Sequence, residues 1–281
     1  MKSKPRTEKP VNLKLALGAA MSAANAVGQM MLKHRHGPKR AQLVTQHDIK
    51  LELDVRCQRL IEKQLRQAFP QVAVLGEEGV SGASDAGYRW VVDPIDGTVN
   101  FTYGIPHACV SIALQGRAAR PTASTYPDGF DTLVGVVYDP FCNEMWTAIR
   151  GQPARLNGRV IRVSTRRKLA EAIVSIGFAK SRETIDATLP YFNELVYRIR
   201  KVRMMGAAAI ALAYVATGRF DAYIERGISL WDIAAGGLIV ECAGGEFWRR
   251  RVGEGQVYRM IATNGLLRRS LRVPDSTPPR K

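Results

Sequence analysis

Residues 75–101 read LGEEGVSGASDAGYRWVVDPIDGTVNF, and acidic side chains gather where two apolar runs end. The runs are VAVL at 72–75 and WVV at 90–92, and both predict short buried strands. The carboxylates at these strand ends are Glu77, Glu78, Asp93 and Asp96. Because open α/β sheets bind ligands beyond the ends of their strands, this stretch predicts an α/β fold with a metal site at one edge of a sheet.

The turn that follows the second run, DPIDGT at 93–98, has chemistry that suits such a site. Pro94 holds the preceding residue extended and has no N–H, so the chain turns sharply and Asp93 and Asp96 can face one pocket. In such a turn the carbonyl of Ile95 is free to act as a hard oxygen ligand. The turn therefore offers oxygen donors to a hard divalent cation.

Gly97 and Thr98 add groups that bind anions. Gly97 lets a backbone N–H approach an anion closely, and the N–H and hydroxyl of Thr98 can join it. Carboxylates beside such a turn suit Mg²⁺ bridged to a phosphate, because Mg²⁺ prefers oxygen ligands and usually shares its shell with substrate phosphate. The alternative is an Asp-Pro turn with solvated acids, which a shorter match would favour. The pair Glu77-Glu78 and the Gly-Thr continuation favour the Mg²⁺ site.

Three blocks of the sequence resemble the signature blocks of the inositol monophosphatase family. They are Gly76-Glu77-Glu78, residues 90–101, and residues 231–236 followed by Gly244-Gly245. The resemblance runs from about residue 11 to about residue 272 and implies one domain with the layered α/β/α/β/α sandwich of the inositol monophosphatase and sugar phosphatase type. Residues 1–10 and 273–281 lie outside this domain and are predicted to be disordered basic tails.

The resemblance also implies a function: Mg²⁺-dependent, lithium-sensitive hydrolysis of a phosphate monoester by a metal-activated water, with two or three Mg²⁺ ions in each site. The first metal would be held by Glu77, Asp93 and the carbonyl of Ile95. The second metal would be held by Asp93, Asp96 and Asp232. The water-activating pair would be Asp48 and Thr98. The groups in contact with the substrate or its phosphate would be Gly97, Thr98, Ala207 and Glu225.

Several of these residues also have a purely structural interpretation. Asp48 precedes a helical pattern over 49–69, which makes it a candidate N-cap. Asp232 falls in the first turn of a predicted helix, where capping and the macrodipole favour a carboxylate. Glu225 could pair with Arg226. Both interpretations stay open for each residue at this point.

Ala207 and Gln42 are two departures from the family pattern that bear on the substrate, and Gln42 stands where an Asp is usual. Family members often carry Ser or Thr at position 207, so Ala207 removes a hydroxyl from the pocket or from a helix cap. Inositol monophosphate is therefore less favoured as the substrate, and a related sugar or polyol phosphate is open. Alternatives on the same scaffold are a fructose-1,6-bisphosphatase, a histidinol-phosphatase or a nucleotide 3'-phosphatase. A different class is a basic regulatory protein that binds RNA or a transcription complex, although the intact set of acids argues against it.

Composition limits the partners. The chain has 281 residues, 46% of them hydrophobic, and a net charge of +16. Residues 1–40 carry a net +8 and residues 246–281 a net +6, which leaves only +2 between them. Because basic tails are usually solvated, we expect nucleic-acid binding to be weak at most. The four cysteines lack C-x-x-C pairing, which is typical of reduced thiols in a cytoplasmic protein.

The rest of the chain predicts ordinary elements. Residues 11–32 form an amphipathic first helix rather than a signal peptide, because the pattern continues past the Ala-x-Ala site, and no run of 18 apolar residues predicts a membrane span. A meandering sheet is expected over 108–114, 133–138, 144–149 and 159–163, with a turn at Asn157-Gly158. Strands and helices then alternate from residue 172 onward. Residues 117–132 predict a surface excursion, a flap or a dimer contact, and the family resemblance implies a homodimer.

Overall fold

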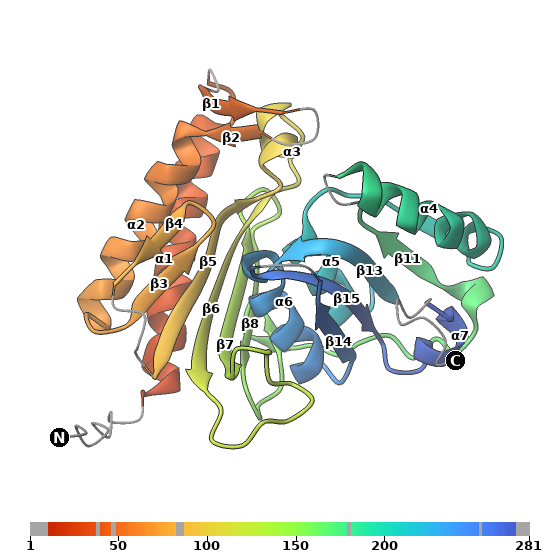
Figure 1. Cartoon of the computed structure of the whole chain (residues 1–281). Coiled ribbons are helices and arrows are strands. Elements are labelled where there is room, and N and C mark those ends of the chain that lie inside the picture. The colour runs from red at the N-terminus through yellow and green to blue at the C-terminus, as the bar shows by residue number, and fades with distance from the viewer. Residues whose placement is uncertain are drawn as a thin grey trace.

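The structure is a computed structural model that describes residues 11–37, 40–45, 49–82, 87–178, 181–252 and 255–273. Its described residues form an eight-stranded sheet, a five-stranded sheet and a two-stranded hairpin. Across the width of Figure 1 the layers are a helix pair, the eight-stranded sheet, a second helix pair, the five-stranded sheet and outer helices. The predicted α/β/α/β/α order of layers is confirmed.

The first layer contains α1 (Leu13–His34) and α2 (Glu52–Ala68), which cover the outer face of the eight-stranded sheet. Helix α1 buries a row of small side chains at helical spacing: Ala16, Ala20, Ala23, Ala24 and Val27. Small residues let the helix lie close to the sheet, and the predicted amphipathic first helix is confirmed. By length and composition alone α1 could also span a membrane, a test that core helices and signal sequences pass equally.

The eight-stranded sheet holds the two apolar runs predicted to be strands. In spatial order its strands are β10 (Arg159–Val160), β9 (Arg155–Leu156), β8 (Glu144–Ile149), β7 (Phe130–Asp139), β6 (Cys109–Arg117), β5 (Tyr88–Asp96), β3 (Ala73–Gly76) and β4 (Gly79–Ser81). Strands β3 and β5 pair in parallel, so their carboxyl ends lie at the same edge. The Asn157-Gly158 turn, with φ of 47° and 80°, joins β9 to β10 rather than β8 to a following strand.

The predicted start of the second helix is wrong. Residues Ile49–Leu51 form strand β2, which pairs in antiparallel fashion with β1 (Ala41–Val44), and α2 begins only at Glu52. The carboxylate of Asp54 accepts a hydrogen bond from the N–H of Leu51 at 2.8 Å. This N–H lies at the N-cap of α2 and has no partner within the helix, so Asp54 supplies its acceptor. The N-cap interpretation of Asp48 is therefore overturned, and Asp48 itself lies outside the described residues.

The second half of the chain forms the five-stranded sheet by the predicted alternation of strands and helices. Its spatial order is β12 (Lys201–Arg203), β11 (Ile173–Ile176), β13 (Ala222–Ser229), β15 (Val257–Thr263) and β14 (Glu246–Arg251). A 3-10 turn at Leu169–Glu171 precedes β11, and α4 (Arg182–Val196) and α7 (Arg268–Leu271) pack outside. Strand β13 ends at Ser229, directly before the first residue of the following helix.

Helices α5 (Ala208–Ala216) and α6 (Leu230–Cys242) lie between the two sheets and are mostly buried and apolar, except for Asp232 and Glu241 in the end turns of α6. Glycines allow the close approach of these layers. A Cβ on Gly135 in β7 would lie 2.8 Å from the carbonyl oxygen of Ala235, and a Cβ on Gly236 would lie 2.7 Å from the Leu212 side chain. Packing without side chains at these points fixes α6 against the first sheet, and the N-terminal turn of α6 points toward the end of β5.

The predicted surface excursion between β6 and β7 is only partly exposed. Tyr126 is buried and meets Tyr258 of β15 edge to face, with ring centroids 5.6 Å apart. Arg249 of β14 stacks over the Tyr126 ring, 3.7 Å from its centroid. Asp128 forms an ion pair with Arg89 of β5 at 2.7 Å. The segment between β6 and β7 therefore contacts both sheets and links the five-stranded sheet to the eight-stranded sheet.

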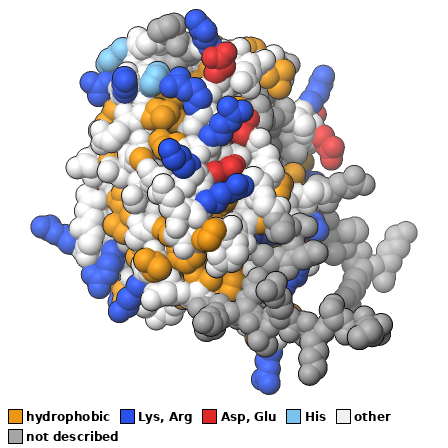
Figure 2. Space-filling view, turned by 90° about the vertical axis from the view of Figure 1, so that its left-hand side faces the viewer, with side chains coloured by type: hydrophobic (Ala, Val, Ile, Leu, Met, Phe, Trp, Pro, Cys, Tyr) orange, Lys and Arg blue, Asp and Glu red, His pale blue; other side chains and the backbone are white. Residues whose placement is uncertain are grey.

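The outer face formed by the first layer carries Lys and Arg side chains among apolar ones (Figure 2). Helix α2 exposes Arg56, Arg59, Lys63 and Arg66 along its length. Acidic side chains lie among them, and Glu62 of α2 forms an ion pair with Arg66. Basic side chains lie on this face as well as at the ends of the sequence.

Candidate active site

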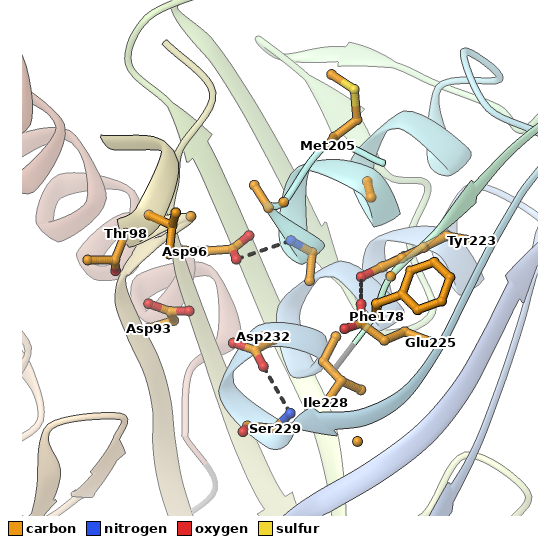
Figure 3. Close-up of a pocket in the computed structure, with 18 of the residues that line it drawn as sticks. Asp93, Asp96, Thr98, Phe178, Met205, Tyr223, Glu225, Ile228, Ser229 and Asp232 are labelled. Carbon is orange, nitrogen blue, oxygen red and sulfur yellow. Dashed lines mark hydrogen bonds between the residues drawn. The ribbon is translucent and has the colours of Figure 1, made fainter. Parts of the chain in front are cut away.

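Three carboxylates from the two halves of the chain meet between the sheets (Figure 3). Asp93 and Asp96 stand at the carboxyl end of β5, and Asp232 stands in the first turn of α6. One oxygen from each of them lies within 4.8 Å of the others. Asp93 and Asp96 are buried and Asp232 is half-buried.

Local hydrogen bonds hold the bulged end of β5 and the turn that follows it. The N–H of Ile95 donates to the Asp93 carboxylate at 3.0 Å, and the hydroxyl of Thr98 donates to the Ile95 carbonyl at 2.9 Å. Gly97 adopts φ of 92° and begins the short helix α3 (Thr98–Thr102), and a Cβ at Gly97 would lie 3.0 Å from the carbonyl oxygen of His107. A positive φ and this close approach both require glycine. Residues 93–96 continue strand β5 through a bulge, so the chain turns at Gly97 and not directly after Asp93 as predicted. The prediction that Asp93 and Asp96 face one pocket is confirmed.

Asp96 also caps a helix from the other half of the chain. Its carboxylate accepts hydrogen bonds from the N–H groups of Ala208 and Ala209, at 3.1 and 2.7 Å. Ala207 is the N-cap residue of α5, and its methyl group cannot accept these bonds. The carboxylate of Asp96 takes the place of the hydroxyl that a Ser or Thr would supply. Ala207 is both the N-cap of α5 and a residue of the pocket lining, so a hydroxyl is missing from both places.

The structure shows the capping role of Asp232 and leaves its metal-ligand role open. Its carboxylate accepts a hydrogen bond from the N–H of Ser229 at 2.9 Å, which caps α6. The same side chain lies beside Asp93. These positions are compatible because an ionised carboxylate has two oxygens and about four acceptor sites.

The electrostatics of the cluster favour a bound cation. Burial raises the pKa of Asp93 well above its usual value, and the charges of Glu77, Asp96 and Asp232 raise it further. Burial raises the pKa of Asp96 to about 7, although the N–H groups of Ala209 and Ala208 oppose the rise. Carboxylates held together against their own repulsion fit Mg²⁺, whose charge would offset that repulsion and whose preferred ligands are oxygens.

The carboxylates form one wall of a pocket with a volume of about 610 Å³. The residues proposed from the sequence and described in the structure all line it: Glu77, Asp93, Ile95, Asp96, Gly97, Thr98, Ala207, Glu225 and Asp232. The opposite wall is apolar around Phe178, Met205 and Ile228. Within this wall Glu225 accepts a hydrogen bond from the hydroxyl of Tyr223. The pocket therefore has an acidic wall and, opposite it, a mainly apolar wall that contains the Glu225 carboxylate.

Two features of the site escaped the sequence analysis. Tyr223 lies two residues before Glu225 on β13, and the period of two along a strand could have placed both on one face. The side-chain amide of Asn100 donates to the carbonyls of His107 and Met205, at 2.9 and 2.8 Å. It ties helix α3 to the segment before α5. No local pattern marks a bond that spans 105 residues.

Comparisons with known proteins agree with this geometry. The inositol monophosphatase family model matches residues 12–270. The chain is 38% identical over 235 residues to the Nus factor SuhB of Xylella fastidiosa, across 83% of this chain and 81% of that protein. It is 35% identical over 257 residues to inositol monophosphatase 1 of Solanum lycopersicum, across 88% and 90%.

A solved structure shares the fold over nearly the whole chain. The extragenic suppressor protein SuhB of Bartonella henselae superposes with a TM-score of 0.80 and 31% identity, over 92% of this chain and 96% of that one. The family match covers every described residue of the acidic cluster. The chain therefore belongs to the inositol monophosphatase family of phosphoric monoester hydrolases.

Proposed function

We propose that the protein catalyses the Mg²⁺-dependent hydrolysis of a sugar or polyol phosphate monoester. The observation that carries this proposal is the meeting of Asp93, Asp96 and Asp232 in one pocket. Their mutual repulsion supports cation binding, and the pocket beside them has room for a small phosphate ester. Relatives named inositol monophosphatases support a polyol phosphate as the substrate.

The residues of the acidic wall divide into two metal-binding sets. Glu77, Asp93 and the Ile95 carbonyl would hold one Mg²⁺. Asp93, Asp96 and Asp232 would hold another, with a third ion possible in the same pocket. The Thr98 hydroxyl bonded to the Ile95 carbonyl leaves that oxygen a second lone pair. When bound, paired Mg²⁺ ions activate water and stabilise the charges on the attacking and leaving oxygens.

Residues of the chain would bind the phosphate and direct a proton. The Gly97–Thr98 turn would place backbone N–H groups against the phosphate oxygens. Thr98, with Asp48, would orient the water and accept its proton. The Glu225 carboxylate would accept a hydrogen bond from the alcohol part of the ester, and Ala207 would contribute backbone and methyl contacts.

A panel of phosphate esters, assayed with and without Mg²⁺, tests this proposal. We expect hydrolysis of inositol 1-phosphate or a related polyol phosphate, loss of activity with EDTA, and recovery on adding Mg²⁺. The family resemblance implies inhibition by lithium at high Mg²⁺. Preference for fructose 1,6-bisphosphate, histidinol phosphate or a nucleotide 3'-phosphate would identify one of the alternatives on this scaffold. Equal activity with EDTA would contradict the role of the acidic wall.

A regulatory role is a second candidate, supported by the relative named Nus factor SuhB and by the basic face of α2. We expect deletion of residues 1–10 and 274–281 to leave ester turnover nearly unchanged, because the described ligands lie between Glu77 and Asp232. RNA binding should be weak and should vanish near physiological salt. Each neutralised phosphate changes the log–log salt slope by about 0.7 for single strands.

Two variants separate the possible binding surfaces. The deletion removes the basic ends, and a joint Arg59→Gln and Lys63→Gln change neutralises part of the α2 face. A flatter salt slope in one variant would assign RNA contact to that surface. Tight RNA binding at physiological salt, with no activity on the ester panel, would favour the regulatory role over the enzyme.

A further inference from the structure

The hairpin of β3 and β4 carries Glu77 in its turn, and Glu78 is the other residue of that turn. The N–H of Glu77 donates to the carbonyl of Val92 in β5 at 3.2 Å, which fixes one side of the turn to the strand that carries Asp93. Glu77 and Asp93 line the same pocket. The placement of this turn therefore decides where the Glu77 carboxylate can lie relative to Asp93.

The side-chain amide of Gln58 holds the other side of the turn from α2, which lies beside β3 and β4 (Figure 1). Its oxygen accepts a hydrogen bond from the N–H of Glu78 at 2.9 Å, and its Nε2 donates to the carbonyl of Gly79 at 3.3 Å. The Gln58 side chain is buried, and both ends of its amide bond to the backbone of this one turn. A buried amide satisfied in this way fixes the turn against the helix.

Glu62, one helical turn further along α2, determines which way the amide of Gln58 points. The Nε2 of Gln58 also donates to the Glu62 carboxylate at 3.0 Å. An ionised carboxylate only accepts hydrogen bonds, so the NH₂ group must face Glu62 and the amide oxygen must face the N–H of Glu78. Arg66 lies 3.9 Å from the Glu62 carboxylate and favours its ionised form. The helix therefore presents the amide in one orientation.

Gly76, the last residue of β3, leaves the space that this amide occupies. A Cβ at Gly76 would lie 2.2 Å from the side-chain oxygen of Gln58. Gly76 does not have a positive φ, so the amide and not the backbone conformation excludes a side chain there. Gln58 contributes no atom to the described lining of the pocket, so its influence on the pocket would act through the hairpin.

We propose that Gln58 is a positioning residue that holds the Glu77 turn in place for binding a divalent cation beside Asp93, with Gly76 providing the room for its amide. The inference rests on the proposed phosphatase function, in which Glu77 is a Mg²⁺ ligand. It deepens that function by assigning part of the metal affinity to a contact made behind the pocket. Groups that orient metal ligands typically change metal affinity by about 10- to 100-fold.

Mg²⁺ binding to the full chain, measured by isothermal titration calorimetry without substrate, tests this inference independently of turnover. We expect Gln58→Ala to raise the Kd for Mg²⁺ by roughly 10-fold, because the turn loses the group that orients its metal ligand. Excess Mg²⁺ should restore kcat to within about threefold of wild type, because mass action refills a weakened site whose ligands remain. A purely structural role for Gln58 would not produce this rescue.

Gly76→Ala tests the same contact from the side of the hairpin. Its Cβ would displace the amide of Gln58, so this variant should also raise the Kd for Mg²⁺ by roughly 10-fold. In the Gln58→Ala protein the obstructing amide is gone, and adding Gly76→Ala should raise the Kd by less than about twofold further. This double-mutant cycle measures whether the two residues act through one contact.

Gln115→Ala is the matched control, because Gln115 is also buried and its amide also joins two groups. Its oxygen accepts from Arg89 at 2.7 Å, and its Nε2 donates to Thr132 at 3.1 Å. Gln115 pairs with the beginning of β5 and not with the end that carries Asp93. We expect Gln115→Ala to lower the melting temperature and to leave the Kd for Mg²⁺ unchanged.

The outcomes are distinct, and thermal melting establishes which variants are folded. Weaker Mg²⁺ binding in both single variants, without added loss in the double variant, supports the inference. An unchanged Kd in Gln58→Ala, losses that add in the double variant, or an equal loss in Gln115→Ala overturns it while the phosphatase function stands. If Gln58→Ala does not fold, Gly76→Ala decides alone, and an unchanged Kd in that variant overturns the inference. If wild type neither binds Mg²⁺ nor hydrolyses any ester of the panel, the proposed function fails and the inference falls with it.

Discussion

Replacing Asp93 with Asn is expected to abolish phosphatase activity and, at the same time, to raise the melting temperature of the metal-free protein. Asp93 belongs to both proposed metal-binding sets, and loss of metal ions that stabilise transition-state charge costs several kcal/mol, or at least about 10³-fold in rate. Asn has nearly the same volume, so packing at the end of β5 is preserved. Burial and the charges of Glu77, Asp96 and Asp232 raise the pKa of Asp93, so its ionised form is unfavourable in the metal-free protein. Asn cannot ionise, and the stability gain is therefore expected at alkaline pH, where the Asp93 carboxylate loses its proton.

Ester hydrolysis and thermal melting in EDTA measure the two effects. The matched control is Asp186→Asn, which neutralises an exposed carboxylate on α4 and should change neither quantity. Activity within tenfold of wild type in Asp93→Asn would remove Asp93 from the catalytic centre. A lower melting temperature without metal would show that the Asp93 carboxylate is stabilised by contacts that offset its repulsion.

Magnesium should stabilise the protein much more at pH 8 than at pH 5. The pKa of Asp96 is raised from 3.8 to about 7 and that of Asp93 is raised as well. Without metal, the folded protein therefore binds more protons than the unfolded chain between about pH 4 and pH 7. The stability that these groups contribute is fully present below about pH 4 and is lost as the pH rises through about 7. Mg²⁺ would bind the ionised carboxylates, so the stabilisation by Mg²⁺ should be larger at the pH at which these groups have lost their protons.

Thermal melts at both pH values, with EDTA and with saturating Mg²⁺, check this expectation. A ligand at 100 times its Kd stabilises the folded state by about 2.7 kcal/mol, which corresponds to a rise of roughly 5 °C for a chain of this size. The rise at pH 5 should be smaller because protons compete for the same oxygens. In Asp93→Asn the difference between the two pH values should shrink. A rise that is equal at both pH values would place Mg²⁺ away from these carboxylates.

Local sequence patterns were sufficient to predict that the residues of the acidic wall lie together. The apolar runs at 72–75 and 90–92 end at the acids, and Pro94 and Gly97 dictate the turn, so short-range sequence predicts that Asp93 and Asp96 share a pocket. Membership of the family is confirmed, and with it the layered fold. The metal-ligand roles of these residues, the homodimer and the cytoplasmic location stay predictions.

Long-range contacts explain what the sequence analysis missed. Ile49 and Leu53 have helical spacing, but β2 forms because Ile49–Leu51 finds a partner in β1, and that pairing overrides the local period. The backbone N–H groups of Ala208 and Ala209 carry no sequence signal, yet they bind Asp96 from more than a hundred residues away. Tyr126 sits in a segment rich in small and polar residues, so its burial under Arg249 depends on the second sheet.

The position of α6 between the two sheets has a consequence for biosynthesis. The ribosome makes Asp93 and Asp96 well before Asp232, and at roughly 5–20 residues per second this delay is on the order of ten seconds. During that time the nascent chain contains Asp93 and Asp96 but lacks α5, whose N–H groups bind Asp96, and α6, which carries Asp232. If these carboxylates bind Mg²⁺ as proposed, the site would be complete only after α6 has been synthesised. Binding of Mg²⁺ would then distinguish a chain that contains Asp232 from a shorter nascent chain.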